Sequence, residues 1–136
     1  MTSPKGFILY RIWYGEHLAY LGRTKQPLQA RIRGHMFAKP MHRVIDIHNV
    51  TKIEYTELPT EADMNLYEIY FINLWKPPLN VDDKAWDELT ISLPEKEWNT
   101  FVPSKWDEWK RQLSSDDMYG WHKRRNEKVF EDDCFI

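Results

Sequence analysis

The sequence has little of what a secreted or membrane-embedded protein needs. Its single cysteine, Cys134, can form no internal disulfide, which excludes a disulfide-stapled secreted domain. No apolar run approaches the roughly 18 residues that span a bilayer, and residues 1–6 contain no apolar signal core. These absences predict a protein of a reducing, cytoplasmic compartment without a membrane partner.

Internal repeats, low-complexity segments and zinc-ligand spacings are absent as well. The histidines His17, His42 and His48 form no metal spacing with a cysteine, and no zinc-finger or helix-turn-helix signature is present. A chain of 136 residues fits one ordinary domain with an appendage and can bury a core without disulfides.

Charge and tryptophan divide the chain near residue 80. Residues 1–80 carry 10 Lys and Arg against 7 Asp and Glu, whereas residues 81–136 carry 9 against 14. A mildly basic front half permits a polyanionic substrate, and an acidic rear half does not favour one. Five of the seven tryptophans lie after residue 80, so we expect that half to fold or to bind a partner.

The pattern of apolar residues predicts an α+β fold. Two β-rich runs, 7–14 and 18–22, flank a short loop with Gly15 and predict a hairpin, and the alternation over 51–56 predicts a third strand. Helices are expected at 27–37, 41–48 and 61–75, and short helices at 84–89, 94–101 and 103–113. We therefore expect one catalytic or binding domain at 1–81 and a Trp-rich, acidic, mainly helical extension at 82–136.

Six residues of the front half stand at informative positions. Arg31 and His35 are four apart on a predicted helix, so both can reach one phosphate. Glu68 lies in an apolar helix, where a carboxylate is costly to bury unless that turn faces a groove or solvent, and it could hold one hard divalent cation. The other three are Tyr10 and Tyr20 on the hairpin strands and Asn80 after Pro77-Pro78.

In this order and spacing, residues 6–81 resemble a GIY-YIG nuclease domain. The matching elements are Ile8-Leu9-Tyr10, Tyr20-Leu21-Gly22, Arg31-x-x-x-His35, Glu68 and Asn80. One departure is Ile8, which replaces the glycine of the first element. The resemblance implies a small three-stranded antiparallel sheet flanked by helices and a metal-dependent DNA endonuclease with one Mg²⁺ or Mn²⁺ ion.

The resemblance also implies a role for each matching residue. Tyr10 would be the general base, helped by His35, because a free phenol with a pKa of about 10 is a poor base at neutral pH. Tyr20 would orient water or phosphate, and Arg31 would stabilise the charge of the transition state. The metal ligand would be Glu68, while Asn80 would fix local geometry or contact phosphate.

Further cations near these elements are candidate phosphate contacts. They are Arg23, Lys25, His42 and Arg43, and for each of them a solvated surface position is the competing interpretation. Arg33 points about 200° away from Arg31 on an ideal helix, so Arg31, one turn before His35, is the preferred arginine. For the C-terminal tryptophans, packing against the front domain competes with base stacking.

Other functions remain open at this stage. The same fold could serve as an inactive nucleic-acid-binding or protein-binding adaptor, or as an inhibitor that uses its acidic tail. A protein partner or a homodimer could use the C-terminal extension. The small size favours a bacterial or phage origin and a cytoplasmic location, with a nuclear location if the chain is eukaryotic.

Overall fold

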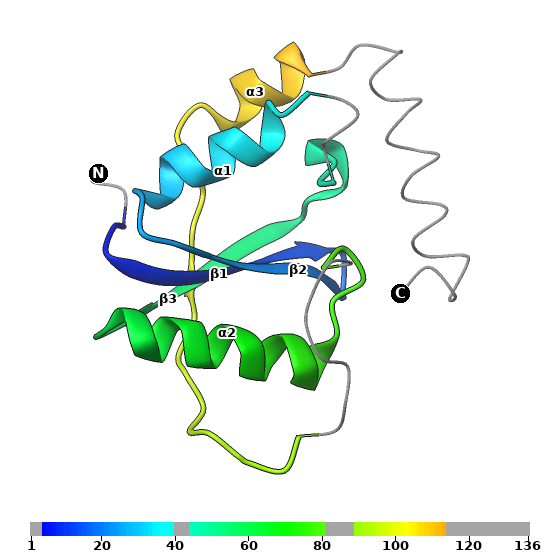
Figure 1. Ribbon diagram of the computed structural model, residues 1–136. Coiled ribbons are helices and arrows are strands. Elements are labelled where there is room, and N and C mark those ends of the chain that lie inside the picture. The colour runs from blue at the N-terminus through cyan, green and yellow to red at the C-terminus, as the bar shows by residue number, and fades with distance from the viewer. Residues whose placement is uncertain (1–3, 40–43, 81–88, 114–136) are drawn as a thin grey trace.

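The computed structural model describes residues 4–39, 44–80 and 89–113, and within them it contains one antiparallel sheet between two layers of helices (Figure 1). The strands are β1 (Phe7–Tyr14), β2 (His17–Thr24), β3 (Lys52–Leu58) and β4 (Asn99–Thr100), in the order β2-β1-β3-β4. The helices are α1 (Leu28–Met36), α2 (Glu61–Trp75) and α3 (Trp106–Gln112), with a 3-10 turn η2 (Ile47–Asn49).

Local sequence signals explain where these elements begin and end. Gly15 turns the β1–β2 hairpin with a φ of 63°. Pro27, with φ −54°, precedes the first turn of α1. At the start of α2 the Thr60 hydroxyl accepts a hydrogen bond from the Asp63 N–H at 3.1 Å, and Lys76 ends that helix in the left-handed conformation before Pro77-Pro78.

Both faces of the sheet are covered, which explains the nearly continuous apolar run of β1. Ile8, Tyr10 and Ile12 pack with α1, while Leu9 packs on the other face with α2. Because successive side chains of a strand point to opposite faces, a strand between two helical layers buries both sets. Figure 1 shows α1 and α3 on one side of the sheet and α2 on the other.

The described part of the C-terminal extension wraps around the β3 edge of the sheet. On the α2 side Trp98 packs against Phe71 and Trp75, and on the α1 side Trp109 lies 4% exposed in the core. Between them β4 pairs with β3 through Glu54–Thr100 and Tyr55–Asn99. The described part of the extension, residues 89–113, therefore belongs to the packed structure.

Several predicted elements agree with the structure and some do not. The hairpin, the third strand and the helices at 27–37, 61–75 and 103–113 are present, with small changes at their ends. The sheet has a fourth strand beyond the three predicted, and the helix predicted at 94–101 is wrong because that segment is extended. Its Trp98 and Phe101 pack on opposite faces of the sheet, as strand alternation allows and one helix face does not.

Two other predicted helices differ from the structure or lie partly outside the described residues. In the predicted helix at 41–48, residues 44–46 are not helical and the helical turn begins only at Ile47, because the Asp46 carboxylate accepts from the His48 N–H and caps a 3-10 turn. Residues 41–43 lie outside the described residues, as do 84–88 of the helix predicted at 84–89; Leu89 itself is not helical. Among the described residues of the extension, 89–113, only α3 is helical, so the expectation of a mainly helical extension holds for α3 and not for residues 89–105.

Candidate active site

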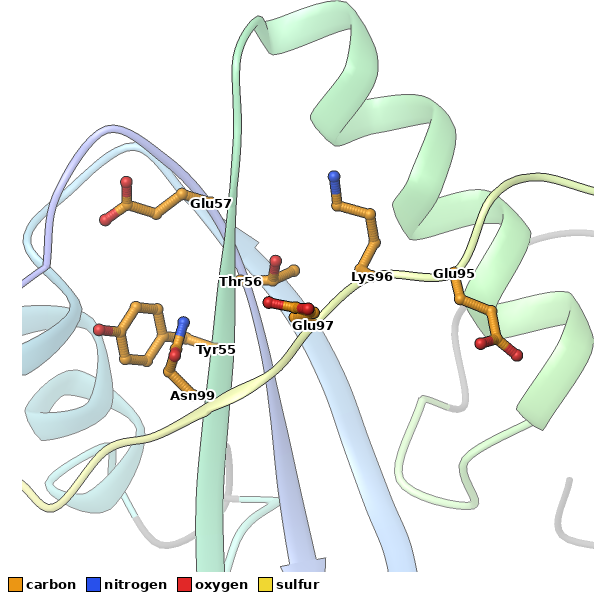
Figure 2. A pocket seen from close by; sticks show the side chains of 7 residues that line it. All are labelled: Tyr55, Thr56, Glu57, Glu95, Lys96, Glu97 and Asn99. Carbon is orange, nitrogen blue, oxygen red and sulfur yellow. The ribbon is translucent and has the colours of Figure 1, made fainter.

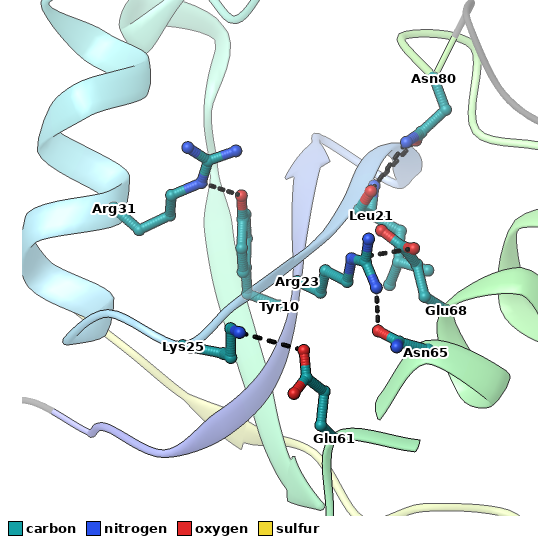
Figure 3. A network of polar contacts seen from close by, with 9 residues as sticks. All are labelled: Tyr10, Leu21, Arg23, Lys25, Arg31, Glu61, Asn65, Glu68 and Asn80. Carbon is teal, nitrogen blue, oxygen red and sulfur yellow. Dashed lines mark hydrogen bonds and ion pairs between the residues drawn. The ribbon is translucent and has the colours of Figure 1, made fainter. Parts of the chain in front are cut away.

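Three predicted site residues meet at the hydroxyl of Tyr10, between β1 and α1. The Tyr10 Oη lies 2.6 Å from Nε2 of His35, and Nε of Arg31 donates a hydrogen bond to the same oxygen at 3.2 Å. The four-residue spacing of Arg31 and His35 places both on one face of α1, as the sequence predicted. Figure 3 shows the Arg31 side chain extended from α1 toward the Tyr10 hydroxyl.

Tyr20 of β2 completes an aromatic cluster around this point. Its ring centroid lies 6.2 Å from that of Tyr10 and 5.3 Å from that of His35, the latter in an edge-to-face arrangement. Tyr10 is fully buried, whereas Tyr20 and His35 are partly exposed. The cluster therefore reaches solvent through Tyr20 and His35.

The absence of a side chain at Gly22 makes room for this cluster. Gly22 stands opposite Tyr10 in the β1–β2 ladder. A Cβ at position 22 would lie 2.5 Å from Tyr10 Oη and 2.9 Å from Tyr20 Cε2, closer than non-bonded atoms can approach. The glycine of Tyr20-Leu21-Gly22 is thus required because the Tyr10 ring crosses over it.

Burial determines the protonation states in the cluster. Loss of solvation, with the neighbouring charge of Arg31, lowers the pKa of His35 to about 4. Burial also raises the pKa of Tyr10 well above its usual value, with Tyr20 adding to that effect and Arg31 opposing it. At neutral pH both groups are uncharged. Because Arg31 can only donate, we assign the Tyr10 proton to the hydrogen bond with Nε2 of a neutral His35.

Arg33 does not share this cluster. Its guanidinium lies 4.7 Å from the centroid of the Phe37 ring, on another face of α1. The preference for Arg31 over Arg33 therefore agrees with the geometry. The electrostatic effect of Tyr10 raises the pKa of Arg31 further, so Arg31 stays cationic.

Glu68 comes from α2, on the other side of the sheet from α1 (Figure 3). Its Oε1 lies 3.4 Å from Nε of Arg23, and its side chain is 13% exposed. Arg23 also donates to Asn65 Oδ1, one turn before Glu68 on α2. Sequence reasoning did not single out Asn65, although its three-residue spacing from Glu68 could have indicated a shared face.

A divalent cation could be held by Glu68 as a single protein carboxylate. No group of three or more His, Cys, Asp or Glu side chains forms a metal cage among the residues that the structure describes. A lone carboxylate whose other coordination positions are filled by water and phosphate oxygens is chemically suited to Mg²⁺ or Mn²⁺. Arg23, whose side chain is 45% exposed, would have to move away from Glu68 when a cation binds.

The side chain of Asn80 is hydrogen-bonded to the backbone of β2 at its outer edge. Its Oδ1 accepts from the Leu21 N–H at 2.9 Å, and its Nδ2 donates to the Leu21 carbonyl at 2.7 Å. The Leu79 N–H continues this pairing with the Ala19 carbonyl at 3.0 Å. Of the two roles expected for Asn80, this geometry favours fixing the strand next to the glycine and tyrosine of β2.

The remaining predicted phosphate contacts divide into two groups. Arg23 and Lys25 are exposed on or just after β2, where Arg23 pairs with Glu68 and Lys25 pairs with Glu61 at 3.0 Å. His42 and Arg43 lie outside the described residues.

None of the helices in the described parts of the chain combines the length and the hydropathy of a membrane span.

A groove of about 540 Å³ lies at the opposite edge of the sheet, where β3 and residues 95–99 diverge (Figure 2). Three carboxylates, Glu57, Glu95 and Glu97, and one cation, Lys96, contribute to its lining. Negative charge there opposes a phosphate backbone. The groove is therefore a poor site for nucleic acid, and the tyrosine cluster is the better candidate.

Comparison with known proteins adds no relative to these observations: no protein-family model, no curated protein and no solved structure matches the chain.

Proposed function

We propose that this protein is a metal-dependent DNA endonuclease of the GIY-YIG type, with its site at the β2 edge of the sheet. The observation that supports the proposal is the meeting of Arg31, His35 and Tyr10 at one hydroxyl, with Tyr20 against them. These side chains come from three elements and form the order of motifs on which the resemblance rests. Structural tyrosines do not require a neutral histidine and a guanidinium on the same oxygen.

In the proposed mechanism, Tyr10 passes a proton and does not exist as a free phenolate. Its raised pKa opposes ionisation in the buried site. The Tyr10 oxygen accepts a proton from the attacking water while its own proton moves to Nε2 of His35, which is neutral at pH 7. His35 thus completes the removal of the proton from water.

The other residues bind and orient the substrate. Tyr20, partly exposed beside Tyr10, orients water or phosphate. Arg31 is exposed and cationic, and it stabilises the charge that develops on the phosphoryl oxygens. A cation held by Glu68 would supply Lewis-acid stabilisation of the leaving oxygen. Arg23, released from Glu68, can then contact phosphate.

A cleavage assay tests the proposal. The purified protein is incubated with supercoiled plasmid or a labelled flapped duplex in Mg²⁺, Mn²⁺ or EDTA, beside Glu68→Gln and the control Glu57→Gln, which changes an exposed carboxylate at the opposite edge. We expect metal-dependent cutting that falls by about a hundredfold or more in Glu68→Gln only. Binding without cleavage by the folded protein, at any metal concentration, would overturn the proposal and favour the adaptor.

A further inference from the structure

Helix α1 is held on two flanks, and only one of them faces the tyrosines. At 100° per residue, Arg31 and His35 lie on one flank and Gln29 and Phe37 on the other, with the buried Leu28, Ile32 and Met36 between them. Rotation of the helix about its axis would therefore move both flanks together.

The second flank is bound by the C-terminal extension through a side chain that imitates backbone pairing. Nε2 of Gln29 donates to the carbonyl of Ser104 at 2.9 Å and to its hydroxyl at 3.0 Å, and Oε1 of Gln29 accepts from the Ser104 N–H at 3.1 Å. These residues are 75 apart in the sequence. Gln29 thus donates two hydrogen bonds to Ser104 and accepts one from it, and these three bonds hold the first turn of α1 against the extension.

The other end of α1 meets the same extension. The Phe37 ring lies edge-to-face with that of Trp109 of α3, with centroids 6.0 Å apart. His48 Nε2 lies 3.0 Å from the carbonyl of Leu113, so the end of α3 is itself anchored. The extension thus contacts α1 at both ends of its outer flank.

We infer that residues 104–109 of the extension set the rotation of α1 and so aim Arg31 and His35 at the Tyr10 hydroxyl. Gln29, Ser104 and Trp109 are positioning residues in this account, since they act through α1: Gln29 and Ser104 bond to each other, and Trp109 packs on Phe37. The tolerance is small, because the His35–Tyr10 distance is 2.6 Å and a displacement of about 1 Å can cost about a hundredfold in rate. The inference rests on the proposed function for its kinetic consequence only.

The variant Gln29→Ala of the full chain tests the inference, with Gln112→Ala, an exposed position of α3, as the matched control. Its first measurement is titration of the His35 ring by NMR, which needs no nuclease activity. The charged or titratable groups that face His35 are Tyr10 from β1, Tyr20 from β2 and Arg31 from α1. If α1 rotates, His35 gains solvent, and we expect its pKa to rise from about 4 to above about 5.

The second measurement is kinetic. We expect kcat of Gln29→Ala to fall about tenfold with KM nearly unchanged. An unchanged His35 titration in folded Gln29→Ala would overturn the inference whatever the activity. A shifted His35 titration in Gln29→Ala, together with a wild-type protein that cuts no DNA, would keep the inference and reject the proposed function.

Discussion

At the scale of single residues, the site depends on groups that act on one another across a fully buried phenol. Tyr10 carries no charge of its own at neutral pH, yet it receives a hydrogen bond from a cation and donates one to a neutral imidazole. The same burial that places these atoms within hydrogen-bond distance also lowers the pKa of His35. Geometry and protonation therefore have one physical origin.

Gly22 offers the sharpest steric test at this scale. We expect Gly22→Ala to cost about 1–3 kcal/mol, because the new Cβ would overlap the buried Tyr10 ring and displace it from His35. Gly34→Ala is the matched control, since a Cβ there has nothing within 4 Å. Because alanine favours a helix over glycine, this substitution should raise the free energy of unfolding by about 0.5–1 kcal/mol. Urea denaturation measures both. Equal stability of the two variants would contradict the close packing at Gly22.

His35 predicts a pH dependence of stability. Its pKa is about 4 when folded and about 6.5 when unfolded, so the unfolded chain binds more protons in that interval. The free energy of unfolding contributed by His35 is complete above pH 6.5 and falls as the pH drops toward 4, by about 2 kcal/mol between pH 7 and 4.5. Denaturation of wild type and His35→Gln at both pH values isolates this contribution. A parallel loss in the two proteins would refute it.

At the scale of elements, the sequence predicted the hairpin, α1 and α2 well because each has a strong local signal. Pro27, the Thr60 cap and the run from Phe7 to Tyr14 act within a few residues of their position. It failed at 94–101, where the conformation depends on a strand and an aromatic cluster far away in the chain. No local pattern distinguishes Trp98 on a helix from Trp98 against Phe71 and Trp75.

Some features of the candidate site likewise follow from local sequence spacing, and others depend on tertiary packing. The face of α1 that carries Arg31 and His35 follows from helical spacing, and the separation of Arg31 from Arg33 does too. The burial of Tyr10 and the pairing of Glu68 with Arg23 require the packed structure, because they join residues 21 to 45 positions apart. The hydrogen bond between the Leu21 N–H of β2 and Asn80 Oδ1 is likewise a tertiary contact.

Trp98 tests the contribution of the extension to the packed structure. The Arg11 guanidinium lies 4.2 Å from the centroid of a Trp98 ring and is also held by Glu54, with a 2.8 Å hydrogen bond. We expect Trp98→Ala to lower the free energy of unfolding by about 2–4 kcal/mol and Trp98→Phe by clearly less. The measurement is urea denaturation followed by circular dichroism. A loss below about 0.5 kcal/mol would show that the segment packs without stabilising the fold.

At the scale of the whole molecule, the order of strands separates charge between the two edges of the sheet. Arg23 and Lys25 lie on or beside β2, where they pair with Glu68 and Glu61, whereas the carboxylates of the groove lie at the β3–β4 edge. The three carboxylates of the groove oppose a phosphate backbone at the β3–β4 edge, and the exposed Arg31 beside Tyr10 favours one at the tyrosine cluster. This arrangement gives the proposed substrate one preferred approach.

The most direct test of the proposed site compares two arginines on one helix. Arg31 donates to Tyr10, while Arg33 lies over Phe37, so the two substitutions remove the same charge from different faces of α1. Single-turnover cleavage of a flapped duplex with Mg²⁺ is measured for Arg31→Ala and Arg33→Ala. We predict a loss of about a hundredfold or more for Arg31→Ala and less than about threefold for Arg33→Ala. Equal rates for the two folded variants would contradict a catalytic role for the Tyr10 cluster.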